Sequence, residues 1–380
     1  MTAELDYFGE SHRILRQTVA RFVDREIRPY VDEWEEAGEF SRDLYRKAAD
    51  VGLLGIGYPE ELGGAEGDIF HEVVLTEELV RSGSGGVAAG LMSLSIAIPP
   101  ILAAGTQEQK QRFIPPVLRG EKIASLGITE PGGGSDVANL RTRAVRDGDC
   151  YVVNGSKTMI TSGCRADLVT LAVRTGEAGP KGVSLLVVET NSPGFTVSKK
   201  LRKMGWWASD TAELSLDDVR VPVENRLGEE GTAFYTIMRN FQKERLYLAL
   251  MANTTAQMAL EESIKYSRAR EAFGKPLLGF QVTRHKLVDM ATLVEVSREF
   301  TYRVAAGIQA GHNKVKEISM AKIFATDICD RVCHAAVQIH GGYGCMREYL
   351  VERLYRDSRI LSIGGGTSEI MKEIVSKLML

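Results

Sequence analysis

The order of three sequence periodicities limits what this chain can fold into. Residues 1 to about 118 show the 3.6-residue period of amphipathic helices, residues 119–227 change to short β-type runs, and residues 228–380 are helical again. A doubly wound parallel sheet needs strands and helices that alternate, so this order excludes a nucleotide-binding fold of that kind. We predict an α+β protein of three domains: an N-terminal helical domain (1–118), a middle β-barrel domain (119–227) and a C-terminal four-helix-bundle domain (228–380).

The expected helices and strands follow from the spacing of apolar residues and from the Pro and Gly residues that interrupt them. In the middle region, Asn154-Gly155 between two apolar runs is the strongest short-range signal of a β-hairpin. The spacing of the β-type runs suits a small barrel or a sandwich. Strands are expected at 150–153, 156–161, 168–173, 183–189, 195–198 and 212–221. Helices are expected at 12–27, 42–52, 71–82, 107–118, 231–269, 280–311, 314–340, 347–363 and 367–379.

Charge and composition exclude several classes of function. The net charge is −3 over 380 residues and no long run of like charges occurs, which argues against nucleic acid as a partner. Residues 1–7 lack the basic and apolar parts of a secretory signal. Gly, Ser and Pro interrupt the apolar segment Val87–Ala103, so no membrane span is expected. We expect a soluble, cytoplasmic protein.

The cysteines indicate neither a disulfide framework nor a metal site. They are five in number and scattered along the chain. Cys329, Cys333 and His334 lie close together on an Ala-rich helix, where the i, i+4 spacing is better explained by the packing of small residues. Because no His-Glu-x-x-His or paired Cys-x-x-Cys motif is present, we predict no metal.

A Gly-rich loop lies where the first helical region gives way to the β-type runs. Its sequence, from Ile128 to Asp136, is Ile-Thr-Glu-Pro-Gly-Gly-Gly-Ser-Asp. Adjacent glycines let backbone N–H groups turn toward an anion, and Thr129 and Ser135 offer hydroxyls. A Gly-rich loop alone is better explained as a tight turn. The whole string is more specific, and it resembles the loop of the acyl-CoA dehydrogenases that binds the flavin and closes over the substrate.

Four more segments extend this resemblance over essentially the whole chain. Two of them have an ordinary alternative when taken alone: a surface side chain before a Pro turn for Arg270, and a helix C-cap for the glycines after Gln338. An Arg guanidinium also suits a diphosphate, because it forms bidentate, charge-assisted bonds. Five motifs in the family's order make coincidence a poor explanation. The four segments are 59–64 (Pro-Glu-x-x-Gly-Gly), 154–161 (Asn-Gly-x-Lys-x-x-Ile-Thr), 270–281 (Arg-x-x-Phe-Gly, then Gln) and 338–344 (Gln-x-x-Gly-Gly-x-Gly).

The resemblance implies that the chain binds FAD. In the family the segment matching 159–161 lies against the flavin ring, and Met159 replaces an aromatic residue common there; a thioether can still pack on an aromatic edge. The family's counterpart of Arg270 reaches the flavin pyrophosphate of a neighbouring subunit, so we expect a homotetramer in which assembly is part of cofactor binding. The implied FAD-binding residues are Leu126, Ile128, Thr129, Gly134, Ser135, Met159, Ile160, Thr161, Arg270, Phe273, Gln281, Gln338, Gly341, Gly342, Thr367, Ser368 and Glu369.

The loop before Gly-Thr near the C-terminus lacks the catalytic acid that many family members carry. They have a Tyr-Glu pair where this chain has Gly364 and Gly365. Glu244 is another candidate, because it lies in an apolar helical stripe where desolvation should raise its pKa. A Glu that bridges to an Arg of a neighbouring helix is the alternative that periodicity leaves open. Resemblance to the isovaleryl-CoA dehydrogenase branch, which lacks the loop acid and carries Glu-Arg at this helix position, favours Glu244 as the base. The stripe consists of Ile237, Phe241, Glu244, Leu248 and Met251.

The glycine at position 365 also predicts how the substrate is held. Its backbone N–H, with a ribityl hydroxyl of the flavin, would hold and polarise the thioester oxygen. The missing side chains should widen the pocket, which favours a branched or bulky acyl group. Trp206, Trp207 and Tyr247 are further aromatic candidates to shape the site. The substrate-binding residues that the resemblance implies are Ser135, Tyr235, Gln242, Lys243, Arg245 and Gly366.

The expected activity is the α,β-dehydrogenation of an acyl-CoA to the trans-2-enoyl-CoA. Glu244 would take the α-proton as a hydride passes to flavin N5. An electron-transferring flavoprotein is the expected electron partner. Two alternatives keep the same fold: an oxidase or flavin monooxygenase that uses oxygen, and an inactive relative that acts as a binding or assembly protein.

Overall fold

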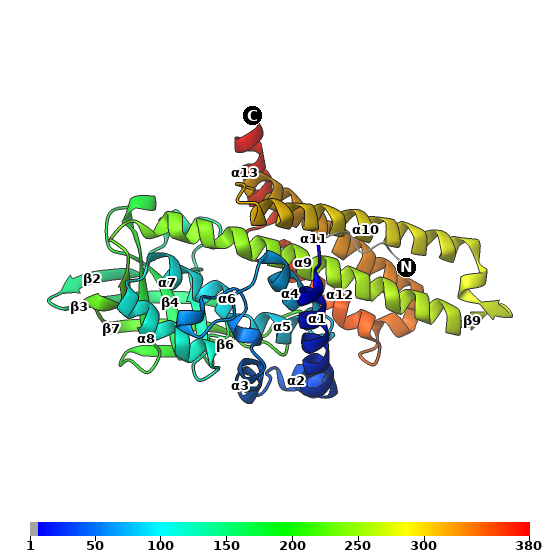
Figure 1. The fold of residues 1–380 in the computed structure, drawn as a ribbon, viewed down its shortest axis with the longest axis horizontal. Coiled ribbons are helices and arrows are strands. Elements are labelled where there is room, and N and C mark those ends of the chain that lie inside the picture. Colours follow the sequence, from blue (N-terminus) through cyan, green and yellow to red (C-terminus); the bar gives the residue numbers. More distant parts are fainter. Residues whose placement is uncertain (1–6) are drawn as a thin grey trace.

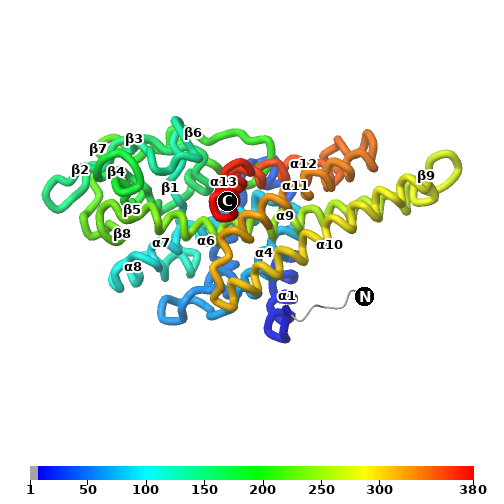
Figure 2. Tube along the Cα trace, turned by 90° about the horizontal axis from the view of Figure 1, so that it is seen from above, coloured from blue at the N-terminus to red at the C-terminus, as the bar shows by residue number. Residues whose placement is uncertain are grey.

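The computed structural model describes residues 7–380, so residues 1–6 of the expected N-terminal domain lie outside the described part of the chain. Helices, a sheet and helices follow one another as the periodicities predict (Figure 1). The sheet lies at one end of the molecule, and the long helix α9 (Ala233–Ala269) begins beside it and runs to the opposite end (Figures 1 and 2). Helices of the N-terminal domain pack against α9, so all three domains meet around its first half.

The N-terminal domain is a set of short helices around α4 (Ile69–Val80), which is buried over most of its surface. Asp68 caps this helix, because its carboxylate accepts hydrogen bonds from the N–H groups of Phe70 and His71. The other helices are α1 (Glu10–Phe22), which continues into a π-helical turn (Val23–Ile27), α2 (Val31–Ala37), α3 (Asp43–Asp50), α5 (Gly85–Leu91), α6 (Leu94–Ala97), α7 (Pro99–Ala104) and α8 (Gln107–Leu118).

The apolar segment after α4 forms three short helices in place of one long helix. Met92 is the C-cap of α5, and Pro99 begins α7, where a missing backbone N–H is tolerated. Within residues 7–380, no single helix is both long enough and apolar enough to cross a membrane. One pair of helices, Gly85–Leu91 and Leu94–Ala104, meets both criteria when taken together, and this pair is bent by 45°.

The middle domain is one sheet of eight strands that curves around a core of its own. Its order is β6-β7-β3-β2-β4-β5-β8, and β1 pairs in parallel with β4. Alternate side chains of neighbouring strands, among them Tyr151, Leu171 and Val188, share this core. One curved sheet therefore encloses the core, whereas a sandwich would enclose it between two sheets. The strands are β1 (Ala124–Gly127), β2 (Arg143–Asp147), β3 (Cys150–Thr161), β4 (Leu168–Arg174), β5 (Val183–Glu189), β6 (Phe195–Lys200), β7 (Thr211–Pro222) and β8 (Arg226–Leu227).

The hairpin predicted at Asn154-Gly155 is wrong, because both residues lie inside the single strand β3. The two-residue turn is Gly148-Asp149, between β2 and β3, and Asp147 pairs with Cys150 across it. Gly155 instead marks a shift of register against β7, with a φ of +150°. An Asn-Gly pair signals backbone freedom, which a bulge uses as readily as a turn.

The C-terminal domain is a bundle in which α9 packs along α11 and α10. Between α9 and α10 the chain makes a small two-stranded tip, β9 (Glu271–Ala272) and β10 (Lys275–Pro276). The helix expected at 347–363 is α12 followed by a 3₁₀ turn over Arg359–Ser362. The helices after α9 are α10 (Gln281–Gln309), α11 (Val315–His340), α12 (Leu350–Ser358) and α13 (Ser368–Met379).

Candidate active site

Glu244 lies in the apolar stripe of α9 and is partly buried, with its Oε2 shielded from solvent. Its Oε2 has no hydrogen-bond partner in the part of the chain that the structure describes. Burial raises the pKa of Glu244 to about 7, although the guanidinium of Arg245 and the ammonium of Lys322 act in the opposite direction. A carboxyl group in this state can exchange a proton near neutral pH, as a general base must.

The glycine loop 364–366 faces Glu244 and is held by two cations. The ammonium of Lys322, on α11, donates to the carbonyl oxygen of Gly364 at 2.6 Å and also to that of Gly366. The Nε of Arg245 donates to the carbonyl oxygen of Gly365 at 3.0 Å. Among residues 7–380 no Arg or Lys forms an ion pair with Glu244, so the bridging role that periodicity left open is absent.

Gly365 occupies a position where a side chain would be strained and would have to displace a neighbour. Its φ is +63°, and a Cβ there would lie 2.6 Å from Cδ1 of Leu248 and 3.4 Å from Oε1 of Glu244. Gly366 is similar, because its φ is +107° and a Cβ there would lie 2.7 Å from Cε of Met371. Both conformations favour glycine over any L side chain. The loop therefore brings backbone, and no side chain, next to the buried acid.

A cavity of about 110 Å³ lies beside Glu244. It is lined by all three domains: α4, α5 and α6 of the first, Thr161 and Trp206 of the middle domain, and α9. Tyr247 lines it too, and its hydroxyl donates to the carboxylate of Glu72. Trp207, by contrast, stacks against Arg356 at 3.8 Å from its guanidinium carbon. Of the three aromatic candidates, two therefore shape this cavity.

Two of the sequence motifs are joined by a buried ion pair that neither motif predicts by itself. Glu130, of the Gly-rich loop, lies 2.8 Å from the ammonium of Lys157, of strand β3. Glu130 also accepts hydrogen bonds from the N–H groups of Arg141 and Thr142, and these interactions lower its pKa to about 2. The pair fixes the loop against the strand segment that begins at Thr158. A Glu and a Lys in two adjacent motifs are the only sequence signal of it.

The predicted residues of this strand segment and loop lie at one edge of the middle domain. Met159 is 68% exposed with a φ of +60°, whereas Ile160 is buried and Thr161 reaches the cavity beside Glu244. Gly134 and Ser135 are exposed on the loop. Leu126 and Ile128 are buried behind them. An exposed thioether between a buried side chain and a Gly-rich loop leaves a surface on which a flat ring can lie.

Family models for the N-terminal, middle and C-terminal domains of acyl-CoA dehydrogenases match residues 9–121, 125–219 and 231–380. The chain belongs to the acyl-CoA dehydrogenase family. It is 39% identical over 378 residues to subunit CarC of the caffeyl-CoA reductase-Etf complex of Acetobacterium woodii, covering 98% of this chain and 99% of that protein. It is 40% identical over 373 residues to the mitochondrial long-chain specific acyl-CoA dehydrogenase of Rattus norvegicus, covering 97% and 86%. A solved structure described as a probable acyl CoA dehydrogenase from Mycobacterium abscessus shares 54% identity and a TM-score of 0.97, covering 98% and 100%.

As a member of this family the chain is an oxidoreductase and a flavoprotein whose cofactor is FAD. A second group of the predicted FAD-binding residues lies far from Glu244. Arg270, Gly341 and Gly342 line a cavity of about 530 Å³ at the opposite end of α9, and a Cβ on either glycine would meet nothing within 4 Å. Glu244 and Arg270 are 26 residues apart along the helix, which is about 39 Å at 1.5 Å per residue. One flavin of one chain cannot contact both.

The other predicted residues of this acyl-CoA dehydrogenase fall into separate places. Phe273 is 96% exposed at the tip after α9, and Gln281 begins α10. Gln338 is in the last turn of α11, and Thr367 caps α13 by accepting from the N–H of Ile370. The remaining residues are Ser368 and Glu369 in the first turn of α13, Tyr235, which is 70% exposed near the start of α9, and Gln242 and Lys243, which line a separate cavity of about 480 Å³.

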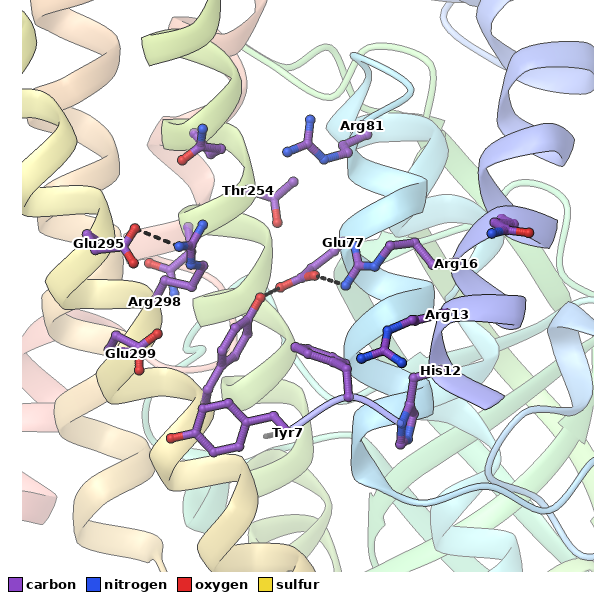
Figure 3. A pocket seen from close by; sticks show the side chains of 15 residues that line it. Tyr7, His12, Arg13, Arg16, Glu77, Arg81, Thr254, Glu295, Arg298 and Glu299 are labelled. Atoms are coloured by element: carbon purple, nitrogen blue, oxygen red, sulfur yellow. Dashed lines mark hydrogen bonds and ion pairs between the residues drawn. The ribbon is translucent and has the colours of Figure 1, made fainter. Parts of the chain in front are cut away.

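Two other groups of polar side chains lie apart from all predicted site residues. One is a cavity of about 450 Å³ between α1, α4, α9 and α10, where Glu77 accepts hydrogen bonds from Arg16 and Tyr302 (Figure 3). In the other, His12, Asp68 and His71 bring donor atoms within 4.8 Å of one another. Since the Asp68 carboxylate is engaged in capping α4 and bonds both imidazoles, we assign this second group to the helix cap and not to a metal.

Proposed function

We propose that this chain catalyses the FAD-dependent α,β-dehydrogenation of an acyl-CoA thioester to the trans-2-enoyl-CoA, with Glu244 as the base. One observation carries the proposal: a carboxyl group with a buried, unpartnered oxygen and a pKa of about 7 lines a cavity that Thr161 also reaches. A buried acid without a partner costs stability, so its retention calls for a functional reason. An inactive binding protein would gain from an apolar residue at this position.

The residues around the base supply the other half of the chemistry. Glu244, as a carboxylate, would accept the α-proton of the thioester. The Gly365 N–H makes no hydrogen bond within residues 7–380, and it would donate to the thioester oxygen together with a ribityl hydroxyl. Such a donor stabilises the negative charge that develops on that oxygen. Bound FAD supplies the acceptor for the β-hydride.

We place the flavin ring against Met159, Ile160 and Thr161, between the middle domain and the glycine loop. The exposure of Met159 and the anchoring of the Gly-rich loop by Glu130 and Lys157 support this placement. The rest of the cofactor would be held partly by another copy of the chain, because Arg270 lies about 39 Å along α9 from Glu244. The contacts proposed from the same chain are Leu126, Ile128, Thr129, Gly134, Ser135, Thr367, Ser368 and Glu369, and those proposed from a neighbouring subunit of a homotetramer are Arg270, Phe273, Gln281, Gln338, Gly341 and Gly342.

A compact, branched acyl group fits the site better than a long straight chain. The cavity of about 110 Å³ is smaller than one of about 150 Å³ that accepts benzene. The loop carries Gly364 and Gly365 where many family members have a Tyr-Glu pair, so no loop side chain extends toward the substrate. Together with Glu244 on the helix, these glycines are the residues that support an isovaleryl-CoA dehydrogenase-like enzyme.

The opposite reaction is a second candidate function, favoured by the similarity to the caffeyl-CoA reductase-Etf subunit. The same residues would then deliver a proton to Cα of an aryl-substituted enoyl-CoA. In either direction an electron-transferring flavoprotein is the proposed redox partner, and a reaction with oxygen is the alternative. Fast peroxide formation in air after reduction of the flavin would contradict the proposed partner.

An anaerobic flavin-bleaching screen tests these proposals. The flavin-loaded protein is mixed with straight, methyl-branched, terpenoid and aryl-substituted acyl-CoAs, and loss of flavin absorbance is followed. We expect the fastest bleaching with methyl-branched chains of about five carbons, an estimate from the cavity size. Equal rates with branched and short straight chains would contradict the proposed preference for branched acyl groups. Bleaching by none of them, with reoxidation of reduced flavin by an aryl-substituted enoyl-CoA, would favour the reductase.

A further inference from the structure

Trp206 reaches the acyl cavity from a loop that the middle domain extends toward the two helical domains. The loop connects β6 to β7, and the indole lines the same cavity as Glu244. The backbone of Trp206 has a φ of +54°, a left-handed conformation that is uncommon for a bulky residue. Such conformations persist only where the surroundings enforce them, and they concentrate at functional sites.

A single buried carboxylate enforces this conformation. Oδ1 of Asp357, on α12, accepts a hydrogen bond from the N–H of Trp206 at 2.6 Å. Its Oδ2 accepts one from the N–H of Gly85 at 3.1 Å. Gly85 begins α5, which carries Ala88 and Ala89 of the cavity wall. Asp357 is 3% exposed, and through these two bonds it joins the C-terminal, middle and N-terminal domains at the cavity.

Three glycines allow close approach around Trp206 and Asp357. A Cβ on Gly85 would lie 2.3 Å from Nε1 of Trp206, and one on Gly86 would lie 2.9 Å from its backbone carbon. A Cβ on Gly205 would lie 2.8 Å from Oδ1 of Asp357. The start of α5 therefore limits the indole on one side, and Asp357 holds the backbone of Trp206.

We propose that Trp206 is the wall that sets which acyl groups the cavity accepts, and that Asp357 is the positioning residue that holds this wall across the domain boundary. The proposal rests on the acyl-CoA activity proposed above and names a determinant of its selectivity. Replacing the indole by a methyl group enlarges the cavity on the side that faces α5. Losing the Asp357 acceptor frees the strained loop, so the wall is no longer held in one place.

Selectivity is measured as the ratio of kcat/KM for 3-phenylpropionyl-CoA to that for isovaleryl-CoA. Trp206→Ala should raise this ratio about tenfold or more, in line with what one or two methylene groups contribute in an apolar pocket. The matched control is Trp207→Ala, because Trp207 is its neighbour in the loop and lies outside the cavity. An unchanged ratio in Trp206→Ala, or an equal rise in Trp207→Ala, would contradict the assignment of Trp206 as the wall that sets acyl selectivity.

The positioning role is tested by a double-mutant cycle with Asp357→Asn, which keeps the shape but offers only one acceptor oxygen to two N–H donors. Alone it should raise the ratio; in the Trp206→Ala background it should change the ratio less than about twofold, because coupled residues are not additive. If Asp357→Asn changes the ratio equally in both backgrounds, or in neither, Asp357 does not act through Trp206. If Asp357→Asn does not fold, Gly85→Ala takes its place in the cycle, since its Cβ must displace the indole.

Failure of the proposed activity is separated from failure of this inference by a second measurement. The Kd of each matching enoyl-CoA is obtained from the flavin spectrum, without turnover. If wild-type protein turns over no acyl-CoA, the ratio of the two Kd values still reports on the wall. An effect of Trp206→Ala on that ratio supports the inference even then, and no effect on either ratio contradicts it.

Discussion

A Cβ on Gly365 would lie 3.4 Å from Oε1 of Glu244, so the loop position and the helix acid share one space. Leu248 closes the same space, with its Cδ1 at 2.6 Å from that Cβ. A side chain on the loop at this position would have to displace Leu248 and would lie against Glu244. A glycine here leaves the site to the carboxyl group of α9, so its occurrence does not by itself indicate an inactive enzyme.

Gly365→Ala should destabilise the protein by about 2 kcal/mol, because alanine is strained at positive φ and its Cβ collides with Leu248. Urea unfolding of the flavin-loaded protein measures the change. Gly364→Ala is the matched control, since its Cβ would approach only the carbonyl oxygen of Ile360, at 3.5 Å. Equal stability of the two variants would show that the loop relaxes away from α9.

The rate of flavin reduction should depend on pH through Glu244. Burial raises the pKa of this carboxyl to about 7, and only the carboxylate accepts a proton. Below pH 7 the rate should therefore fall about tenfold per pH unit, and above it the rate should level off. Stopped-flow measurements from about pH 5 to about pH 9 under anaerobic conditions test this. A rate that stays constant down to pH 5 would mean that the base titrates lower, as an exposed or ion-paired acid does.

Lys322→Met should weaken the site in two ways. It removes the donor for the carbonyl oxygens of Gly364 and Gly366, and each unsatisfied carbonyl costs about 1–3 kcal/mol. It also removes a positive charge that lowers the pKa of Glu244, so the acid limb of the pH profile should move to higher pH. Lys316→Met is the control, because Lys316 is half-exposed on the same helix. If Lys322→Met is destabilised but its pH profile does not move, the charge of Lys322 does not lower the pKa of Glu244 as expected.

Sequence patterns predicted most of the architecture because the periods are strong and the domains are separate in the chain. The stripe that contains Glu244 could be recognised from spacing alone, and α9 places it as expected. The prediction of a turn at Asn154-Gly155 was wrong, because a bulge and a turn require the same backbone freedom. The bond between Asp357 and Trp206 could not be foreseen, since it joins residues 151 positions apart and depends on how the domains dock.

Arg270→Ala should release FAD more readily from the assembled protein. Arg270 and the open glycines 341 and 342 line one cavity, where a guanidinium can pair with a diphosphate. We expect a rise of about tenfold or more in the Kd for FAD, from the loss of a charge-assisted pair. Arg268→Ala, an exposed neighbour, should leave it unchanged. Fluorescence titration of the apoprotein with FAD measures both, and equal affinities would place the pyrophosphate elsewhere.

Glu244→Gln gives the most direct test of the central claim that this residue is the base. The amide keeps the size of the side chain but cannot accept the α-proton, so the loss of a positioned base should slow flavin reduction by about 10²–10⁴-fold. FAD content and the spectral shift on binding isovaleryl-CoA should stay as in the wild type. The measurement is the anaerobic single-turnover rate of flavin bleaching, compared with Glu262→Gln as a matched loss of charge on the same helix. A rate for Glu244→Gln equal to that of the wild type would contradict the assignment.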